Sequence, residues 1–196
     1  WKGLQDIACD SKVESLLAQM IAYQVDGARG RLGSGTEFVL RVRADAQVRR
    51  EFAELADALE ASIRPAEPLP GLEDTPLRLH ARYGVREVLT AVGWLTEFRR
   101  PPFQAGVLPL SARKTELLFV TLDKRSGYHE RIAYRDYAID PARFHWQSQN
   151  AAGPDTPAGR RYTESGHNGW RFSLFVRETP SDAYAACGLV SLEHAE

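Results

Sequence analysis

Two segments in the first third of the chain carry apolar residues at helical spacing. One follows the capping pattern of Ser11 and Glu14 and ends at Gly27. The other runs from Asp45 to Arg64 and is ended by Pro65. Their apolar faces consist of Val13, Leu16, Leu17, Met20 and Ile21, and of Val48, Phe52, Leu55, Leu59 and Ile63. We therefore predict a small helical subdomain over residues 1–70, in which the run 38–42 fits either a strand or a helix.

Prolines and glycines between residues 65 and 76 predict a linker, and beyond it the pattern changes. Short apolar runs then alternate with turn residues, which is typical of strands. The candidate strands are 77–83, 106–110, 117–123, 133–139, 144–149 and 171–177. A helix over 85–92 interrupts them, and Thr156-Pro157 can begin another. We expect an α+β protein whose second domain, 77–196, is a strongly curved β-sheet or barrel.

Charge is distributed unevenly, although the formal net charge is only −1. Residues 1–77 contain 9 basic and 13 acidic side chains, whereas residues 78–178 contain 16 basic and 10 acidic ones. The basic block has 14 arginines and 2 lysines. Arginine suits phosphates and the edges of bases, so the block favours nucleic-acid binding. A genome rich in G and C would produce the same arginine bias, and the pattern alone does not separate the two explanations.

Sequence patterns of several enzymes are missing from the chain. It has no Walker phosphate-binding loop, no nucleophile elbow, no His-x-Lys nuclease pair and no close histidine spacing for zinc. Cys9 and Cys187 are too isolated for a disulfide framework or a zinc site, so we expect a reducing cytoplasm. No apolar window approaches the ~18 residues of a membrane span. We therefore expect no catalytic residue, metal or cofactor in this chain, and no membrane partner.

The densest group of candidate binding residues lies between Tyr134 and Asn150. Aromatic rings there alternate with hydrogen-bonding side chains, a mixture that suits the extraction of a base from a duplex. Asp136 can accept a hydrogen bond from the amino group of cytosine, and nearby arginines can contact phosphates. The candidate DNA-binding residues are Arg82, Tyr83, Tyr134, Asp136, Tyr137, His145, Trp146, Gln147, Ser148, Gln149, Arg160 and Arg161.

About half of this group must be structural, because successive side chains of a strand point to opposite faces. Phe144, Trp146 and Ser148 share one face, while His145, Gln147 and Gln149 share the other. We expect Phe144 in the core, and the face that Trp146 serves stays open. Asp136 and His145 would also suit an acid–base pair, but a polar cluster in a binding pocket fits this composition better.

Five runs of the sequence resemble one family in order and spacing. They are LHARYGVREVL, KTELLFVTLDK, YRDYAIDPARFHWQSQN, GRRY and LFVRE, and the resemblance is strong over about residues 77–178 and weak over the helical first third. They resemble the C-terminal domain of bacterial proteins that join a phospholipase-D-type nuclease to a superfamily-2 helicase. In the SauUSI-type members that domain is the target-recognition domain of an ATP-dependent, modification-dependent restriction enzyme. The resemblance implies an SRA-like (PUA-related) barrel that binds duplex DNA containing 5-methylcytosine and flips the modified base.

The resemblance also implies partners for the chain. These are double-stranded DNA and the helicase and nuclease domains of a longer protein, with ATP and Mg²⁺ serving that parent protein. The chain begins at Trp1 rather than at methionine, which fits an excised domain. Three alternatives stay open: a reader of hydroxymethylcytosine or of a phosphorothioate backbone, a catalytic domain that processes nucleic acid, and an adaptor that binds protein or RNA.

Overall fold

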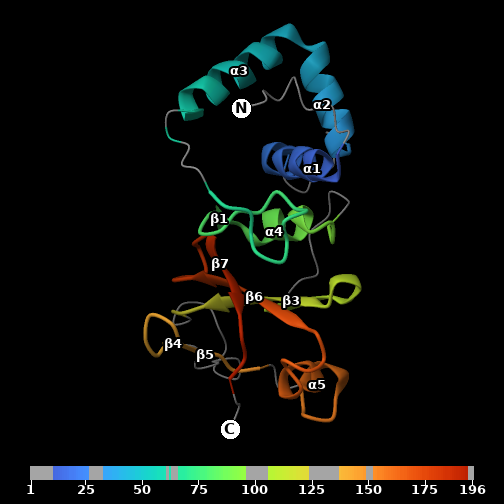
Figure 1. Cartoon of the computed structure of the whole chain (residues 1–196). Coiled ribbons are helices and arrows are strands. Elements are labelled where there is room, and N and C mark those ends of the chain that lie inside the picture. The colour runs from blue at the N-terminus through green and yellow to red at the C-terminus, as the bar shows by residue number, and fades with distance from the viewer. Residues whose placement is uncertain are drawn as a thin grey trace. The chain divides into compact units, whose positions relative to one another are not determined.

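The computed structural model describes residues 11–26, 33–60, 62, 66–95, 106–123, 137–148 and 152–193 (Figure 1). Within these ranges the chain is an α+β protein. The helices are α1 (Lys12–Asp26), α2 (Gly35–Ala44), α3 (Ala46–Glu60), α4 (Val85–Ala91) and α5 (Pro157–Thr163), with a 3₁₀ turn at Ser111–Arg113. The strands are β1 (Arg82–Tyr83), β2 (Val107–Leu110), β3 (Thr115–Thr121), β4 (Tyr137–Ala138), β5 (Phe144–His145), β6 (Arg171–Arg177) and β7 (Tyr184–Val190).

The chain forms two compact units, Trp1–Pro102 and Phe103–Glu196, a division that differs from the predicted domains 1–70 and 77–196. The described part of the proline-rich segment packs inside the first unit instead of linking two domains. Leu69, Leu72 and Leu77 are all 0% exposed there. The amide of Leu69 donates to the carbonyl of Leu77 at 3.1 Å, which closes the segment on itself. Prolines mark turns as well as linkers, and these turns are held by buried leucines.

The first unit contains the two helices predicted from apolar spacing, which α1 and α3 confirm. The ambiguous run 38–42 is helical and forms part of α2. Ser34 caps the start of that helix: its hydroxyl accepts from the amide of Glu37, while the Glu37 carboxylate accepts from the amide of Ser34. This capping box decides the ambiguity, since it satisfies amides at the start of a helix. A buried cluster joins α1 to α2: Ala18, Ala22, Phe38, Val39 and Val42.

The second unit is built on four longer strands in the order β7-β6-β3-β2. The central pair, β3 and β6, is parallel from Thr115 opposite Arg171 to Thr121 opposite Arg177, and the flanking pairs are antiparallel. A parallel pair needs a long crossover, and here the crossover includes β4, β5 and α5. Among the described residues the strands form an open mixed sheet and close no barrel, so the expected barrel is corrected to a sheet with edges.

Individual strand predictions differ in outcome. The strands at 106–110, 117–123 and 171–177 are confirmed as β2, β3 and β6. Within the predicted strands 77–83 and 144–149, the described residues form strands of only two residues each, β1 and β5. Of the predicted strand 133–139, the described part contains only β4. The sequence prediction missed β7, whose small residues Ala185, Ala186 and Gly188 carry little strand propensity. The predicted helices at 85–92 and after Thr156 are confirmed as α4 and α5.

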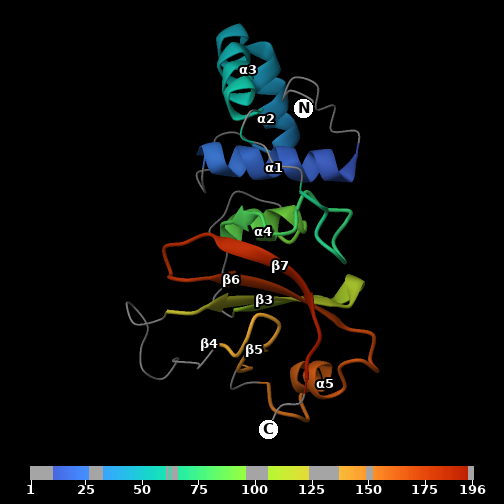
Figure 2. The same ribbon diagram turned by 60° about the vertical axis from the view of Figure 1, so that its left-hand side comes forward.

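The crossover between β3 and β6 places its elements on one face of the sheet. In Figures 1 and 2, the β4–β5 hairpin and α5 lie on the same side of β3 and β6. That face presents a buried cluster of Leu118, Val120, Phe172 and Leu174. The opposite face holds other side chains, among them Phe119, which stacks on Phe175 with ring centroids 5.2 Å apart. The candidate site is built on the first face.

Candidate nucleic-acid interface

Residues 137–148, called the aromatic ribbon below, form a short hairpin with a locally stabilised turn. The Asp140 carboxylate accepts hydrogen bonds from the amides of Ala142 and Arg143 at 2.9 and 2.8 Å, and from the Arg143 Nε at 2.7 Å. The amide of Ile139 donates to the carbonyl of Arg143 at 2.9 Å. These bonds favour the charged carboxylate and hold the pKa of Asp140 below its ordinary value, the bond from the Arg143 side chain contributing most. The turn therefore needs no tertiary contact to keep its shape.

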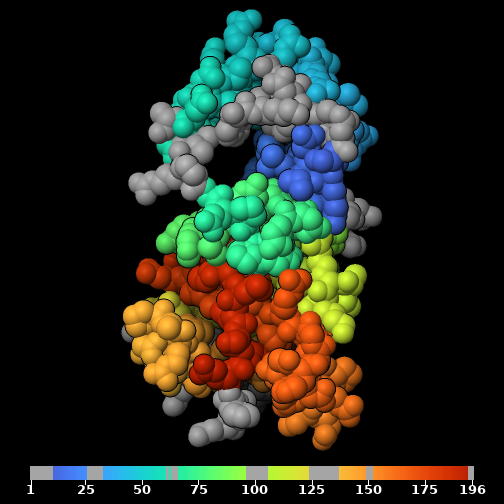
Figure 3. Space-filling view, in the orientation of Figure 1, coloured from blue at the N-terminus to red at the C-terminus, as the bar shows by residue number. Residues whose placement is uncertain are grey.

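One face of the aromatic ribbon is exposed and carries stacked rings. Tyr137 and His145 are direct cross-strand partners, and their rings lie 4.8 Å apart at an interplanar angle of 9°. Tyr137 is 51% exposed and Ile139 is 53% exposed, and Gln147 is exposed as well. Figure 3 shows the ribbon at the surface in gold. This face offers flat aromatic and apolar surface together with hydrogen-bonding groups, as stacking on a nucleobase requires.

The other face of the aromatic ribbon is fastened to the sheet. Phe144 and Trp146 pack against the buried cluster of β3 and β6, so the expectation that Phe144 faces the core is confirmed. Trp146, whose face the sequence left open, also points toward the core. Its indole meets the ring of Tyr162 edge to face, at 5.1 Å and 78°. Ser148 is half-buried. Trp146 thus anchors the ribbon in this structure, and the exposed rings are those of Tyr137 and His145.

Helix α5 is short and is held at both ends by side chains. The Thr156 hydroxyl accepts from the amide of Gly159 at 3.0 Å, and Pro157 occupies the first turn. A Cβ at Gly159 would overlap the carbonyl of Gly153, so glycine permits the close approach of that loop. At the other end the Asn168 amide group donates to the carbonyls of Arg160 and Arg161 at 3.2 and 3.1 Å. The second of these bonds pairs a carbonyl near the helix end, whereas the Arg160 carbonyl also accepts from the amide of Glu164 at 3.1 Å.

A buried glutamate fastens α5 to the sheet. Glu116, on β3, is 0% exposed and accepts from the Arg161 Nε at 2.8 Å, the Arg161 Nη2 at 3.2 Å and the Tyr162 hydroxyl at 3.0 Å. The guanidinium of Arg161 also lies over the Trp170 ring, 5.0 Å from its centroid. The hydrogen bond to Glu116 raises the pKa of Arg161, and burial, followed by the charge of Glu116, raises that of Tyr162. The paired donors offset the cost of burying the carboxylate.

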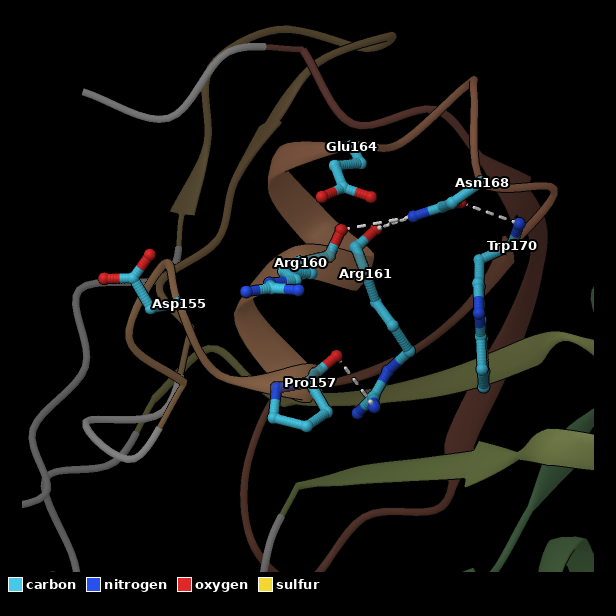
Figure 4. A pocket seen from close by; sticks show the side chains of 7 residues that line it. All are labelled: Asp155, Pro157, Arg160, Arg161, Glu164, Asn168 and Trp170. Carbon is cyan, nitrogen blue, oxygen red and sulfur yellow. Dashed lines mark hydrogen bonds between the residues drawn. The ribbon is translucent and has the colours of Figure 1, made fainter.

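The two neighbouring arginines of α5 therefore have different surroundings. In Figure 4 their side chains leave the helix in different directions, beside an open depression of about 470 Å³. Arg161 is engaged by Glu116, and its Nη1 donates to the Pro157 carbonyl at 3.4 Å. Arg160 is exposed. The depression is lined by Asp155, Pro157, Arg160, Arg161, Glu164, Asn168 and Trp170. Of the two arginines, Arg160 is the one with its charge directed to solvent, where a phosphate would reach it.

The predicted site residues fall into three groups. The first group lies in the second unit, on the ribbon and on α5, and consists of Tyr137, His145, Trp146, Gln147, Ser148, Arg160 and Arg161. Arg82 and Tyr83 belong to the first unit, where Arg82 is exposed and the Tyr83 hydroxyl accepts from the amide of Arg78 at 2.9 Å. Tyr134, Asp136 and Gln149 lie outside the described residues, and so does one half of the suggested acid–base pair of Asp136 and His145.

Several residues that shape the interface were missing from the sequence prediction. Glu116 is the main one, and its signal was available: it is the one charged residue of a mostly apolar strand, on the same face as Leu118 and Val120. Lys114 and Arg171 add exposed cations near α5, and the Lys114 Nζ donates to the Asn168 carbonyl at 3.3 Å. Such cations look like ordinary surface charge in a sequence, because only the fold places Lys114 against Asn168, which itself donates to the carbonyls of Arg160 and Arg161.

The described residues also bear on metal sites and on membrane-spanning helices. In the ranges given above, no three histidine, cysteine, aspartate or glutamate side chains gather as metal ligands do. No helix in the described part of the chain has the length and apolar character needed to cross a bilayer. The thiol of Cys187 is free and exposed, whereas Cys9 lies outside the described residues.

Comparison with known proteins identifies a family but no relative of known activity. No curated protein and no solved structure matches the chain. A family model described as a domain of unknown function, DUF3427, matches residues 77–189, which is more than half of the chain. The match begins at Leu77, where the sequence predicted the second domain to begin, and it includes both the aromatic ribbon and α5. The chain is therefore a member of the DUF3427 family.

Proposed function

We propose that this chain is a recognition module for modified duplex DNA, and that it reads 5-methylcytosine in a flipped base. The proposal adopts the SRA-like role implied by the sequence resemblance, with nuclease and ATPase activities supplied by other domains of a restriction enzyme. The observation that carries it is the exposed Tyr137–His145 stack on a ribbon whose opposite face, with Phe144 and Trp146, is anchored in the core. An anchored ribbon presents its rings without a large ordering cost on binding.

The energetics of base extrusion are consistent with such a surface. Taking a base out of a duplex costs a few kcal/mol, and stacking on an aromatic ring returns ~1–3 kcal/mol per base. Burying the added methyl group contributes about 0.8 kcal/mol, which is only a few-fold in affinity. Gln147 supplies an exposed amide for hydrogen bonding to a base edge. Larger discrimination would require a steric or hydration penalty on the unmodified base.

Cations near α5 support binding to the DNA backbone. Arg160, Lys114 and Arg171 are exposed in the second unit, to which the aromatic ribbon also belongs. Contacts from such side chains to phosphates fix the position of a protein on the duplex but carry no sequence information. Base recognition by the ribbon and backbone binding by the cations are therefore separable by mutation.

The proposal is tested by the affinity of the chain for matched duplexes that differ only at one central position. The duplexes carry cytosine, 5-methylcytosine, 5-hydroxymethylcytosine or a phosphorothioate, and each is titrated at several salt concentrations. We expect the methylated duplex to bind most tightly. Tyr137→Ala should weaken its binding by about 5- to 150-fold, the loss of one stacking platform, and should leave the salt dependence unchanged. Trp94→Ala, which removes an exposed ring from the first unit, is the matched control.

Three results would replace the proposal with one of its alternatives. Equal binding of methylated and plain duplexes at every salt concentration excludes recognition of 5-methylcytosine. Tight binding of only the hydroxymethylated or the phosphorothioate duplex assigns the chain to that other mark. Nicking of plasmid DNA by the purified chain with Mg²⁺, abolished by His145→Ala, would favour a catalytic domain.

A further inference from the structure

We infer that Tyr162 is a positioning residue for the aromatic ribbon, joining it to the buried Glu116. The inference rests on the proposed function, because it states what sets the orientation of the recognition surface. Tyr162 lies on α5 and makes its contacts with three other elements. Its ring meets Trp146 of the ribbon at 5.1 Å and Phe172 of β6 at 5.8 Å, and its hydroxyl donates to Glu116 of β3 at 3.0 Å.

The polar end of Tyr162 fixes the direction of its ring. Glu116 lies on a seven-residue strand whose residues are all buried, so its backbone position is set by the sheet. Its carboxylate is oriented by Arg161 through two nitrogen–oxygen contacts of 2.8 and 3.2 Å. An apolar residue at position 162 would fill space without this directional bond. A carboxylate that accepts from both an arginine and a tyrosine specifies one arrangement of α5 on the sheet.

The ring of Tyr162 contacts the aromatic ribbon, so the position of α5 on the sheet also orients the ribbon. The contact with Trp146 has an interplanar angle of 78°, the edge-to-face geometry that aromatic pairs prefer. Trp146 directly follows β5, which carries His145, and His145 stacks on Tyr137. The ladder that joins β4 to β5 spans only two residue pairs, so the ribbon needs contacts of this kind to hold it on the sheet.

The test compares Tyr162→Leu with Tyr162→Phe and with the control Trp170→Leu. Trp170 is a half-buried aromatic residue that packs on the same apolar cluster, and it contacts Arg161. Hydrogen–deuterium exchange of residues 144–148 in the free chain reports the opening of the ribbon, and duplex titrations report the preference for the modified base. In Tyr162→Leu we expect exchange about three- to tenfold faster, as loss of one edge-to-face contact implies, together with loss of the preference. Tyr162→Phe, which keeps the ring but loses the hydrogen bond to Glu116, should show a smaller effect of the same kind on both readouts, and Trp170→Leu should leave the ribbon protected.

Two results would overturn the positioning role. One is a folded Tyr162→Leu variant with wild-type exchange in the ribbon, and the other is equal loss of protection in Trp170→Leu. A wild-type chain without preference for modified DNA would instead refute the proposed function. In that case the exchange data, which need no DNA, still decide whether Tyr162 positions the ribbon.

Discussion

The pair of strands β3 and β6 and the aromatic ribbon each contain two stacked rings, in opposite surroundings. On the sheet, Phe119 and Phe175 stack with centroids 5.2 Å apart, and Phe175 is 0% exposed. On the ribbon, Tyr137 and His145 stack at 4.8 Å, and Tyr137 is 51% exposed. The strand pair has seven residues in register, whereas the ribbon has two. The ring geometry is thus similar, and what differs is the number of neighbours that cover the rings.

This difference separates a core contact from a binding surface. Rings covered on both faces contribute burial and packing, which stabilise the fold. Rings whose outer faces reach solvent can still gain burial and stacking energy when a ligand covers them. A planar base is a ligand of the right shape. The contrast predicts that changes in the sheet act mainly on stability, while changes on the ribbon and on the exposed side of α5 act mainly on binding.

The largest effect is expected where a charge is buried in the sheet. Glu116→Ala leaves the guanidinium of Arg161 and the hydroxyl of Tyr162 without their shared acceptor, so the free energy of unfolding should fall by about 3–5 kcal/mol. Denaturant unfolding measures this loss. The double change Glu116→Leu with Arg161→Leu should recover much of it, because no charge stays buried. A single variant as stable as the wild type would contradict the role given to this pair.

A smaller and different effect is expected on the exposed side of α5. Arg160→Ala should leave stability within about 0.5 kcal/mol of the wild type and weaken modified and plain duplexes equally. Loss of one phosphate contact should reduce the slope of log K against log salt by about 0.9. Glu164→Ala on the same helix is the charge control. An unchanged slope in a folded Arg160→Ala variant would exclude a phosphate contact at this position.

The smallest effect concerns the turn of the ribbon. The hydrogen bonds to Asp140 lower its pKa in the folded chain, so its charged form contributes stability above the ordinary pKa of 3.8. That contribution is lost as the pH falls through the lowered pKa. In an NMR titration, the amide signals of Ala142 and Arg143 should therefore shift with a midpoint below 3.8. Asp140→Asn should abolish this transition, and a midpoint at or above the ordinary value would show that the turn is not held by these bonds.

Local patterns predicted the elements whose causes are local. The stripes of α1 and α3, the cap at Thr156 and the long strands β3 and β6 follow from neighbouring residues, and the structure confirms them. The prediction left residues 38–42 open between strand and helix. The capping box of Ser34 and Glu37, which is visible in the sequence, would have decided for the helix. The missed strand β7 is different, because its small residues form a strand only by pairing with β6.

By itself, the sequence determined the α+β class, most helix positions and the stretch that carries the candidate site, because periodicity, capping and composition act between near neighbours. It also determined that Phe144 packs inward. The parallel pairing of β3 with β6, and with it the open sheet, was decided by the tertiary structure, which brings together residues 56 positions apart, such as Thr115 and Arg171. The same pairing positions Glu116 to accept hydrogen bonds from Arg161 and Tyr162, and so distinguishes the half-buried, paired Arg161 from the exposed Arg160 beside it. The two arginines are identical in sequence terms, and burial, which is a property of the folded chain, gives them different roles.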